Sequence, residues 1–395
     1  MEQSGPVDDL RWWAAETTRR AKALREMIER LAPWLSPENR NLLNQISDEV
    51  PRALSELTLA SLWAASADID AQLVNYLENP AADPVLSETA RALRQQLSAS
   101  LPGADELVRK LTEVVDEADR LVQAMDFRFL YDRSRKLLSI GCDAGRESVV
   151  AGCYDLLASE ARSAIFAAIA KGDIPQETWF HLGRAQVLWR GQGVLLSWSG
   201  TMFEYLMPAL WFKHYPRTLL EQSARVAVQC QKDWAKEKGM PWGISEAAYN
   251  VQDAAGHYQY RAFGVPALAI NPNPEEDVVV SPYASFLALA FDPRQAVRNL
   301  QRMTELGWLG EFGFYDSIDF APPRVEPGQR FKVVPCCMAH HQGMSLLAAC
   351  NLLTDGAIQK LFHSEPAICA TELLLHERLL PVNNPINHAK NRTAR

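Results

Sequence analysis

The chain has 395 residues, of which 48% are hydrophobic and 22% charged, a composition typical of a globular protein and not of a disordered or fibrous one. Its net charge of -8 argues against nucleic acid as a partner, because a phosphate backbone requires a basic surface. The sequence has no apolar run of the roughly 18 residues that a membrane span requires, so we expect no such segment.

Short sequence motifs exclude several further classes of site. The seven cysteines are scattered, without a CxxC pair and without a histidine at zinc-finger spacing, so we expect free thiols and no metal. The sequence has no glycine-rich phosphate loop, no GxSxG and no HExxH. We therefore expect no cofactor, and neither a serine hydrolase nor a metalloprotease.

Residues 1–125 are expected to form an N-terminal helical region. Apolar residues recur three and four positions apart from Leu10 to Leu31, which predicts a first helix. Proline-containing breaks separate the next predicted helices, over about 37–49, 51–77, 86–99 and 103–125. This region contains no cluster of residues with catalytic character.

The composition changes at Asp126, where two short strands and a turn over residues 126–141 predict a β-hairpin. Predicted helices follow over about 150–171, 175–188, 201–214, 216–238, 243–250, 281–290, 293–307, 339–353 and 355–362. We expect an all-α fold, either an (α/α)6 barrel or a generic helical bundle. The expected divisions are 1–125, a barrel over 126–385 that shares helices with the first region, and a tail over 386–395.

The first segment with chemical character contains Trp198, Ser199 and Glu204. Ser199 can cap a helix, and Glu204 then falls in the first turn, where the helix dipole favours a carboxylate. The alternative is a polar cleft, in which the ring of Trp198 stacks on a sugar and Glu204 binds hydroxyls. The sequence leaves both interpretations open.

The second segment places Glu246 among Trp242, Tyr249 and Asn250. Partly apolar surroundings raise the pKa of a carboxyl, which is what a general acid needs near neutral pH. The alternative is an ordinary acidic residue at the start of a helix. Next along the chain, Tyr258, Gln259, Tyr260 and Arg261 could bind a polyhydroxylated ligand or hold a nearby carboxylate.

Two later segments add a second acid and a pair of histidines. Asp316 follows Tyr315 in an aromatic loop, and His340, His341 and Gln342 lie further on. Adjacent histidines point in different directions on a helix, which disfavours a shared metal and favours hydrogen bonds to substrate or to a catalytic carboxylate. Carboxylates among tryptophans and tyrosines are typical of glycoside cleavage, in which two carboxyls flank the scissile bond.

Five sequence blocks resemble the glycoamylase-like domain in the middle of cyclic β-1,2-glucan synthases. They are SWSGTMFEYLMP (197–208), PWGISEAAYN (241–250), YQYRAFGVP (258–266), GFYDSIDF (313–320) and MAHHQGMSLLA (338–348). Residues 126–141 and 154–180 resemble the entry to that domain, so the resemblance covers roughly 126–375. The helices before 126 resemble the connecting region of those synthases.

The resemblance implies an (α/α)6 barrel related to endo-β-1,2-glucanases. It implies an anomer-retaining transglycosylase that acts on linear β-1,2-glucan, with Glu246 as acid/base and Asp316 as nucleophile. The implied partners are the glycosyltransferase and phosphorylase-like domains of the synthase. The implied location is the cytoplasmic side of the bacterial inner membrane.

The residue at position 316 departs from the resemblance, because a glutamate is common there in retaining members. Retention needs carboxyls about 5–5.5 Å apart and inversion about 6.5–9.5 Å, and aspartate is one methylene shorter than glutamate. An inverting endo-β-1,2-glucanase with Asp316 as base is therefore an alternative. A non-catalytic glucan-binding module of the synthase and an enzyme for another glycan are further alternatives.

Overall fold

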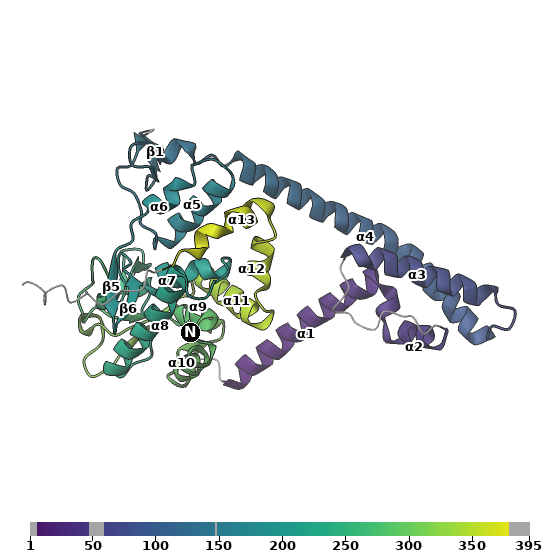
Figure 1. Cartoon of the computed structure of the whole chain (residues 1–395). Helices are drawn as coiled ribbons and strands as arrows, with labels where there is room; N and C mark the ends of the chain where they lie inside the picture. The colour runs from purple at the N-terminus through teal and green to yellow at the C-terminus, as the bar shows by residue number, and fades with distance from the viewer. Residues whose placement is uncertain (1–5, 47–58, 147, 379–395) are drawn as a thin grey trace, which may run out of the picture. The chain divides into compact units, whose positions relative to one another are not determined.

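The computed structural model describes residues 6–46, 59–146 and 148–378 (Figure 1). The chain divides into two compact units, residues 1–125 and 126–395. Each unit encloses its own cluster of buried apolar side chains. The fold is all-α, as predicted, and in the described part of the chain the strands form only two- and three-stranded pieces.

The first unit is a set of helices around a small core. Its α-helices are α1 (Pro6–Leu31), α2 (Pro37–Ile46), α3 (Leu59–Glu78) and α4 (Pro84–Ala124). The core contains Trp34, Leu43, Leu73 and Leu93, all fully buried. The predicted helix over 51–77 begins in residues that lie outside the described part.

Helix α4 corrects one prediction, because residues 86–99 and 103–125 form one helix and not two. Asp83 caps its start, where the carboxylate accepts hydrogen bonds from the N–H groups of Val85 and Leu86. The helix continues through Pro102. An internal proline costs about 3 kcal/mol, and in a 41-residue helix the remaining backbone hydrogen bonds outweigh that cost.

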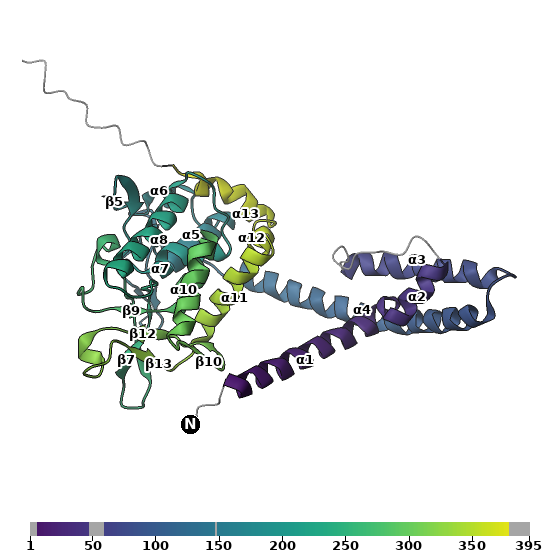
Figure 2. The ribbon, with the colours of Figure 1, turned by 90° about the horizontal axis from the view of Figure 1, so that it is seen from below.

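The second unit contains nine α-helices within residues 126–146 and 148–378. They are α5 (Ser159–Ala170), α6 (Glu177–His181), α7 (Met202–Leu206), α8 (Leu219–Glu237), α9 (Pro282–Leu287), α10 (Pro293–Glu305), α11 (Ala339–Leu353), α12 (Ala357–Phe362) and α13 (Pro366–Thr371). Helices α11, α12 and α13 follow one another along one side of this unit in both views (Figures 1 and 2). The predicted helices over 175–188 and 201–214 are shorter, since α6 ends at His181 and α7 at Leu206.

Short 3₁₀ segments extend or connect these helices. They are η1 (Pro33–Leu35), η3 (Arg128–Leu130), η4 (Met207–Leu210), η5 (Pro266–Leu268), η6 (Ala288–Ala290), η7 (Pro322–Arg324) and η8 (Glu372–His376). The core of the second unit is rich in aromatic rings, among them the fully buried Phe166, Trp179, Phe263 and Trp308.

All paired strands are antiparallel. The hairpins are β1 (Tyr131–Asp132) with β2 (Leu137–Leu138), β3 (Cys142–Asp143) with β4 (Ser148–Val149), β5 (Gln186–Trp189) with β6 (Gln192–Leu195), β7 (Ala247–Gln252) with β8 (Tyr258–Arg261), and β10 (Leu309–Gly310) with β11 (Gly313–Phe314). A three-stranded sheet has the order β13 (Lys332–Val334), β12 (Ser317–Asp319), β9 (Val279–Val280). The hairpin predicted over 126–141 is confirmed by β1 and β2.

The helix predicted over 243–250 is wrong, because residues 247–252 form strand β7. The turn that follows decides the structure: the Asp253 carboxylate accepts hydrogen bonds from the N–H groups of Ala255 and His257, and Gly256 adopts φ 82°. Alanines favour helix when isolated, but here Ala247 and Ala248 are fully buried inside a hairpin. The two ends of this hairpin hold Glu246 and Tyr260 close together.

A close crossing of two loops places the start of α7. A Cβ on Gly264 would collide with the backbone of Ser199 and Gly200, and a Cβ on Gly200 would collide with the Val265 carbonyl. Gly200 also adopts φ 75°, in the left-handed region that favours glycine. The crossing therefore needs both glycines, and it fixes the segment that leads into Glu204.

Candidate active site

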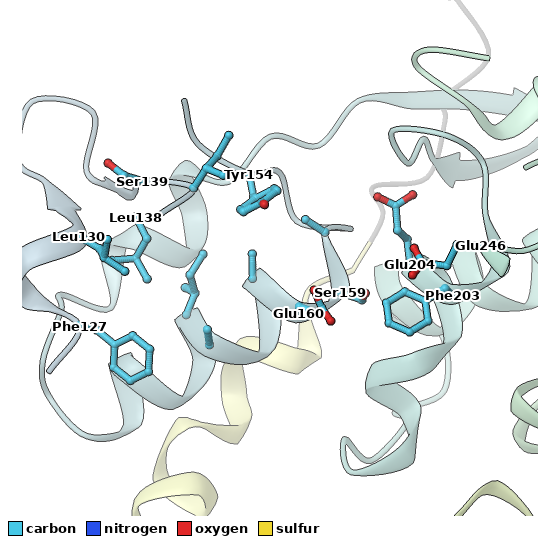
Figure 3. Close-up of a pocket in the computed structure, with 15 residues that line it drawn as sticks. Phe127, Leu130, Leu138, Ser139, Tyr154, Ser159, Glu160, Phe203, Glu204 and Glu246 are labelled. Atoms are coloured by element: carbon cyan, nitrogen blue, oxygen red, sulfur yellow. The ribbon is translucent and has the colours of Figure 1, made fainter. Parts of the chain in front are cut away.

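A cavity of about 360 Å³ opens in the second unit, a volume within the range of small-molecule sites (Figure 3). Three glutamates line it: Glu160, Glu204 and Glu246. Figure 3 shows them near Phe203 at one end, with the apolar side chains of Phe127, Leu130 and Leu138 toward the other. The cavity combines a carboxyl-rich end with an apolar wall.

Glu246 directly precedes β7 and is held from two sides. Its backbone N–H donates to Thr201 Oγ1 over 2.9 Å, and its side-chain Oε1 accepts a hydrogen bond of 2.8 Å from the Tyr260 hydroxyl. Burial raises the pKa of the Glu246 carboxyl, the Tyr260 hydrogen bond partly opposes this, and the charge of Glu160 raises it further. Glu246 is therefore a carboxyl with a raised pKa that faces the cavity.

Glu204 lies in the first turn of α7, which is where one of the two interpretations of the sequence placed it. Burial raises its pKa to about 7, and its Oε2 atom is buried without a hydrogen-bond partner among the described residues. The fully buried guanidinium of Arg162 donates to the Glu204 carbonyl oxygen over 3.1 Å, and burial lowers the pKa of Arg162 to about 10. The Glu204 carboxyl thus binds a proton more tightly than an exposed glutamate does.

Glu160 is a pocket residue that the sequence reasoning did not single out. It lies exposed in the first turn of α5, where the helix dipole stabilises negative charge. An acidic residue at the start of a helix is common for purely structural reasons, so the sequence carried no signal of its own. Only the position of α5 against the cavity distinguishes it.

Asp316 lies outside the cavity lining and is only 2% exposed. Its Oδ2 accepts a hydrogen bond of 2.9 Å from the Ala248 N–H, and its Oδ1 lies 2.6 Å from His341 Nδ1. A nucleophile must present an oxygen to the substrate, and both oxygens of this carboxylate are bonded within the protein. Its position favours a supporting role.

His341 connects Asp316 with the cavity. Its ring stacks on Tyr283, with centroids 3.8 Å apart and an interplanar angle of 15°. Its Nε2 atom lies 3.2 Å from the Tyr260 hydroxyl. Asp316, His341, Tyr260 and Glu246 thus form one continuous hydrogen-bonded series that ends at the cavity.

Several predicted sugar-binding residues have structural positions instead. Trp242 is 7% exposed in the core, and its backbone N–H and C=O both bond the Asn299 amide. Ser199 is buried, whereas Trp198 is 59% exposed and does not line the cavity.

The β7–β8 hairpin uses its polar residues for its own packing. The Tyr249 ring lies beneath the guanidinium groups of Arg261 and Arg324, at 5.6 and 5.1 Å from its centroid. The Asn250 N–H donates to Asp319 Oδ2, and the Asn250 side chain donates to the Arg324 carbonyl oxygen. These contacts hold the hairpin against strand β12.

The remaining predicted residues lie around the series without lining the cavity. Gln342 donates to the Phe314 carbonyl oxygen over 2.9 Å, and Tyr315 packs against Gly310. The His340 ring is exposed and lies 4.1 Å from the His341 ring, centroid to centroid. In β8, Tyr258 is half-buried and Gln259 is exposed.

Residues 6–46, 59–146 and 148–378 hold no group of three or more His, Cys, Asp or Glu side chains placed to bind a metal ion. Across the same ranges, no helix has the length and apolar character needed to cross a membrane.

Comparison with known proteins identifies one family and one curated relative. The profile of the putative glucoamylase family matches residues 153–366. The cyclic β-(1,2)-glucan synthase NdvB of Rhizobium meliloti is 45% identical over 289 residues, which cover 73% of this chain and 10% of that protein. The chain therefore spans only a tenth of the length of the relative it matches.

Solved structures resemble this chain at low sequence identity. A β-1,2-glucanase from Parabacteroides distasonis superposes with a TM-score of 0.51 and 13% identity, over 79% of this chain and 44% of that chain. An endo-β-1,2-glucanase from Chitinophaga pinensis, in complex with sophorotriose and glucose, has a TM-score of 0.48 and 17% identity, over 79% and 70%.

Proposed function

The chain belongs to the putative glucoamylase family and is a glycoside hydrolase-type enzyme domain, and from this premise we propose that it acts on linear β-1,2-glucan as an anomer-retaining transglycosylase. The resemblance to the glycoamylase-like domain is confirmed by the family match. Identity of 45% to a synthase of cyclic β-1,2-glucan supports this substrate, and ring closure by such an enzyme supports transfer.

The observation that carries the proposal is the set of three glutamates in one cavity. A retaining mechanism needs one carboxyl that is protonated and one that is ionised and accessible. Glu246, whose pKa burial raises, fits the acid/base, and the exposed Glu160 at the start of α5 fits the nucleophile. This assignment replaces Asp316 as nucleophile, because Asp316 is buried against His341.

The reaction then runs in two steps. Glu160 attacks the anomeric carbon while Glu246 gives its proton to the leaving sugar oxygen. Glu246, now ionised, removes a proton from the hydroxyl of an acceptor chain, which displaces Glu160 and restores the original anomer. Glu204, whose pKa burial raises to about 7, is suited to hydrogen-bonding a sugar hydroxyl in the same cavity.

The first test is incubation with linear β-1,2-glucan while product lengths are followed by chromatography. We expect chains both longer and shorter than the starting material, and a loss of about 100-fold or more in rate for Glu246→Gln, because proton transfer contributes on that order. Exposed Glu305→Gln serves as the matched control and keeps the wild-type rate. Unchanged chains, or a wild-type rate in Glu246→Gln, would overturn the proposal.

A second substrate separates the two roles. An aryl glycoside with a good leaving group needs no acid, so Glu246→Gln should retain its first step, seen as a burst of released phenol. Glu160→Gln should lose that burst. A burst in Glu160→Gln would exclude Glu160 as nucleophile.

The anomeric form of the first product, followed by NMR, distinguishes the alternatives. Inversion would favour an endo-β-1,2-glucanase in which a second carboxyl acts as base on water. Binding of glucan without cleavage or transfer would favour a glucan-binding module.

We further propose that the chain works beside glycosyltransferase and phosphorylase-like domains of a larger membrane enzyme, on its cytoplasmic side. The match to a tenth of a cyclic glucan synthase supports this context. Co-purification of the full-length protein with membranes, and protection of this segment from external protease in intact cells, would test it.

A further inference from the structure

Three hydrogen bonds connect Asp316 to Glu246 through His341 and Tyr260. Which residue donates in each of them depends on where the protons lie. We propose that Asp316 holds His341 as an imidazolium, and that His341 thereby directs the Tyr260 hydroxyl hydrogen onto Glu246. The series Asp316–His341–Tyr260–Glu246 would then share one proton across the acid/base of the reaction. This inference rests on the proposed function only for its catalytic consequence.

The first link is the Asp316–His341 pair. The two side chains are 0% and 2% exposed, and Asp316 Oδ1 lies 2.6 Å from His341 Nδ1. A buried carboxylate is costly unless a positive charge or hydrogen bonds compensate it. One oxygen already accepts the Ala248 N–H, so His341 Nδ1 must carry a hydrogen and donate it to the other.

The second link is the fixed orientation of the His341 ring. Stacking on Tyr283 at 3.8 Å and 15° sets the ring plane, and the Asp316 contact sets its rotation. Nε2 is therefore held 3.2 Å from the Tyr260 oxygen.

The third link is the single hydrogen of the Tyr260 hydroxyl. Burial and the charge of Glu246 raise the pKa of Tyr260, so the hydroxyl keeps this hydrogen. Donation to Glu246 Oε1, at 2.8 Å, uses it. The contact with His341 Nε2 is then favourable only if Nε2 also carries a hydrogen, which makes His341 an imidazolium.

The opposite arrangement holds the same number of protons. Protonated Glu246 donates to Tyr260, and Tyr260 donates to neutral His341. Passing from this arrangement to the first breaks the Glu246 O–H and Tyr260 O–H bonds, and forms a new Tyr260 O–H and a His341 Nε2–H bond. Glu246 becomes an anion and His341 a cation, so the proton is held inside the protein, and the reverse shift through Tyr260 returns it to Glu246 for the acid step.

The surrounding groups are compatible with a positive charge on His341. Tyr283 covers one face, and burial raises its pKa, so it stays neutral. Burial first, and then the charge of His341, lowers the pKa of His340. Burial and the charge of Asp316 raise the pKa values of Cys336 and Cys337, so both thiols stay neutral. The charge of Glu160, on α5, raises the pKa values of Glu246 and Tyr260.

The proton positions can be measured without any activity. In ¹⁵N-histidine-labelled protein, NMR at pH 8 should show both ring nitrogens of His341 protonated, and Nε2 should lose its proton in Tyr260→Phe and in Glu246→Gln. Exposed His257→Gln leaves the His341 signals unchanged and serves as a control for assignment. A neutral His341 in the wild type, or an imidazolium that survives both variants, would overturn the inference.

The catalytic consequence appears in the pH profile of kcat/KM on linear β-1,2-glucan. The Tyr260 hydrogen bond and the charge of His341 both lower the pKa of Glu246, so their loss raises it. Tyr260→Phe should therefore move the alkaline limb upward by about one pH unit. His341→Gln and the double variant should give the same shift, because the residues act in series; additive shifts would contradict this.

Tyr260 is partly exposed, so the Tyr260→Phe protein should fold even if substitution of the buried His341 prevents folding. The series therefore remains testable. A chain without activity on the glucan would refute the proposed function, and the NMR result would still decide the proton positions. An unchanged pH profile in an active Tyr260→Phe enzyme would refute the series alone. His341, Tyr260 and Asp316 are thus positioning residues for Glu246.

Discussion

At the scale of single residues, the candidate site depends on which carboxyls are charged. Glu160, Glu204 and Glu246 share one cavity but have different surroundings. Glu160 is exposed at a helix start, whereas Glu204 and Glu246 are half-buried. The Glu204 backbone accepts a hydrogen bond from Arg162, and the Glu246 side chain accepts one from Tyr260. Environments that separate the protonation of neighbouring acids are the usual basis of acid/base roles.

The half-buried Glu204 should make the stability of the protein depend on pH. Its folded-state pKa of about 7 exceeds the ordinary value of 4.5, so the unfolded chain releases this proton first as pH rises. The free energy of unfolding should fall between about pH 4.5 and pH 7, by on the order of 3 kcal/mol. Glu204→Gln should abolish that fall in urea denaturation at pH 5 and pH 8.

The exposed Glu305→Gln is the control for this measurement and should leave the difference between the two pH values unchanged. An equal difference in wild type and Glu204→Gln would show that Glu204 does not hold its proton in the folded state.

The sequence singled out Glu246 by its aromatic neighbours, and Glu246 lines the cavity. It could not separate Asp316 from the cavity, since the burial of Asp316 depends on α11, which begins more than twenty residues later. The sequence likewise did not show that Trp242 is a core residue and not a sugar-binding one. Its ring packs into a core that sequence neighbours do not reveal.

At the scale of elements, the β7–β8 hairpin positions the site. Arg324 holds this hairpin to β12, since it pairs with the fully buried Asp319 and with Asp277 and lies over Tyr249. The sequence predicted a helix over 243–250, whereas pairing with β8 and the Asp253 turn give a strand. Long-range pairing of this kind has no local signature.

Removal of Arg324 should therefore destabilise the protein strongly. Arg324→Met leaves the Asp319 carboxylate buried without a cation, which we expect to lower the free energy of unfolding by about 3–5 kcal/mol. Arg261→Met removes a partly exposed arginine that also pairs with Asp277, and it should cost no more than about 1 kcal/mol. Urea denaturation of both variants checks this, and equal losses would show that burial of Asp319 is not the cause.

At the scale of the whole molecule, two compact units each enclose a separate core. The all-α class and most helices from α5 onward were predictable from apolar periodicity. The length of α4 was not, because a proline usually ends a helix and the sequence does not show that the helix continues through it.

Separate cores predict separate unfolding transitions. Leu73→Ala empties a fully buried site in the first unit and should cost about 2–5 kcal/mol there. Calorimetry should show the corresponding transition at lower temperature, with the other unchanged and glucan activity retained. Leu287→Ala, in the second core, should lower the transition temperature of the second unit and leave that of the first unchanged. Transitions that move together in both variants would contradict independent units.

The hairpin that joins Glu246 to Tyr260 also bears on the order in which the site forms during folding. Only 14 positions separate these two residues along the chain, whereas 81 separate Tyr260 from His341. Closing a short loop costs less chain entropy than closing a long one, and hairpins form within microseconds. The acid/base should therefore acquire its hydrogen-bond donor early, and its proton-sharing partner only when α11 docks.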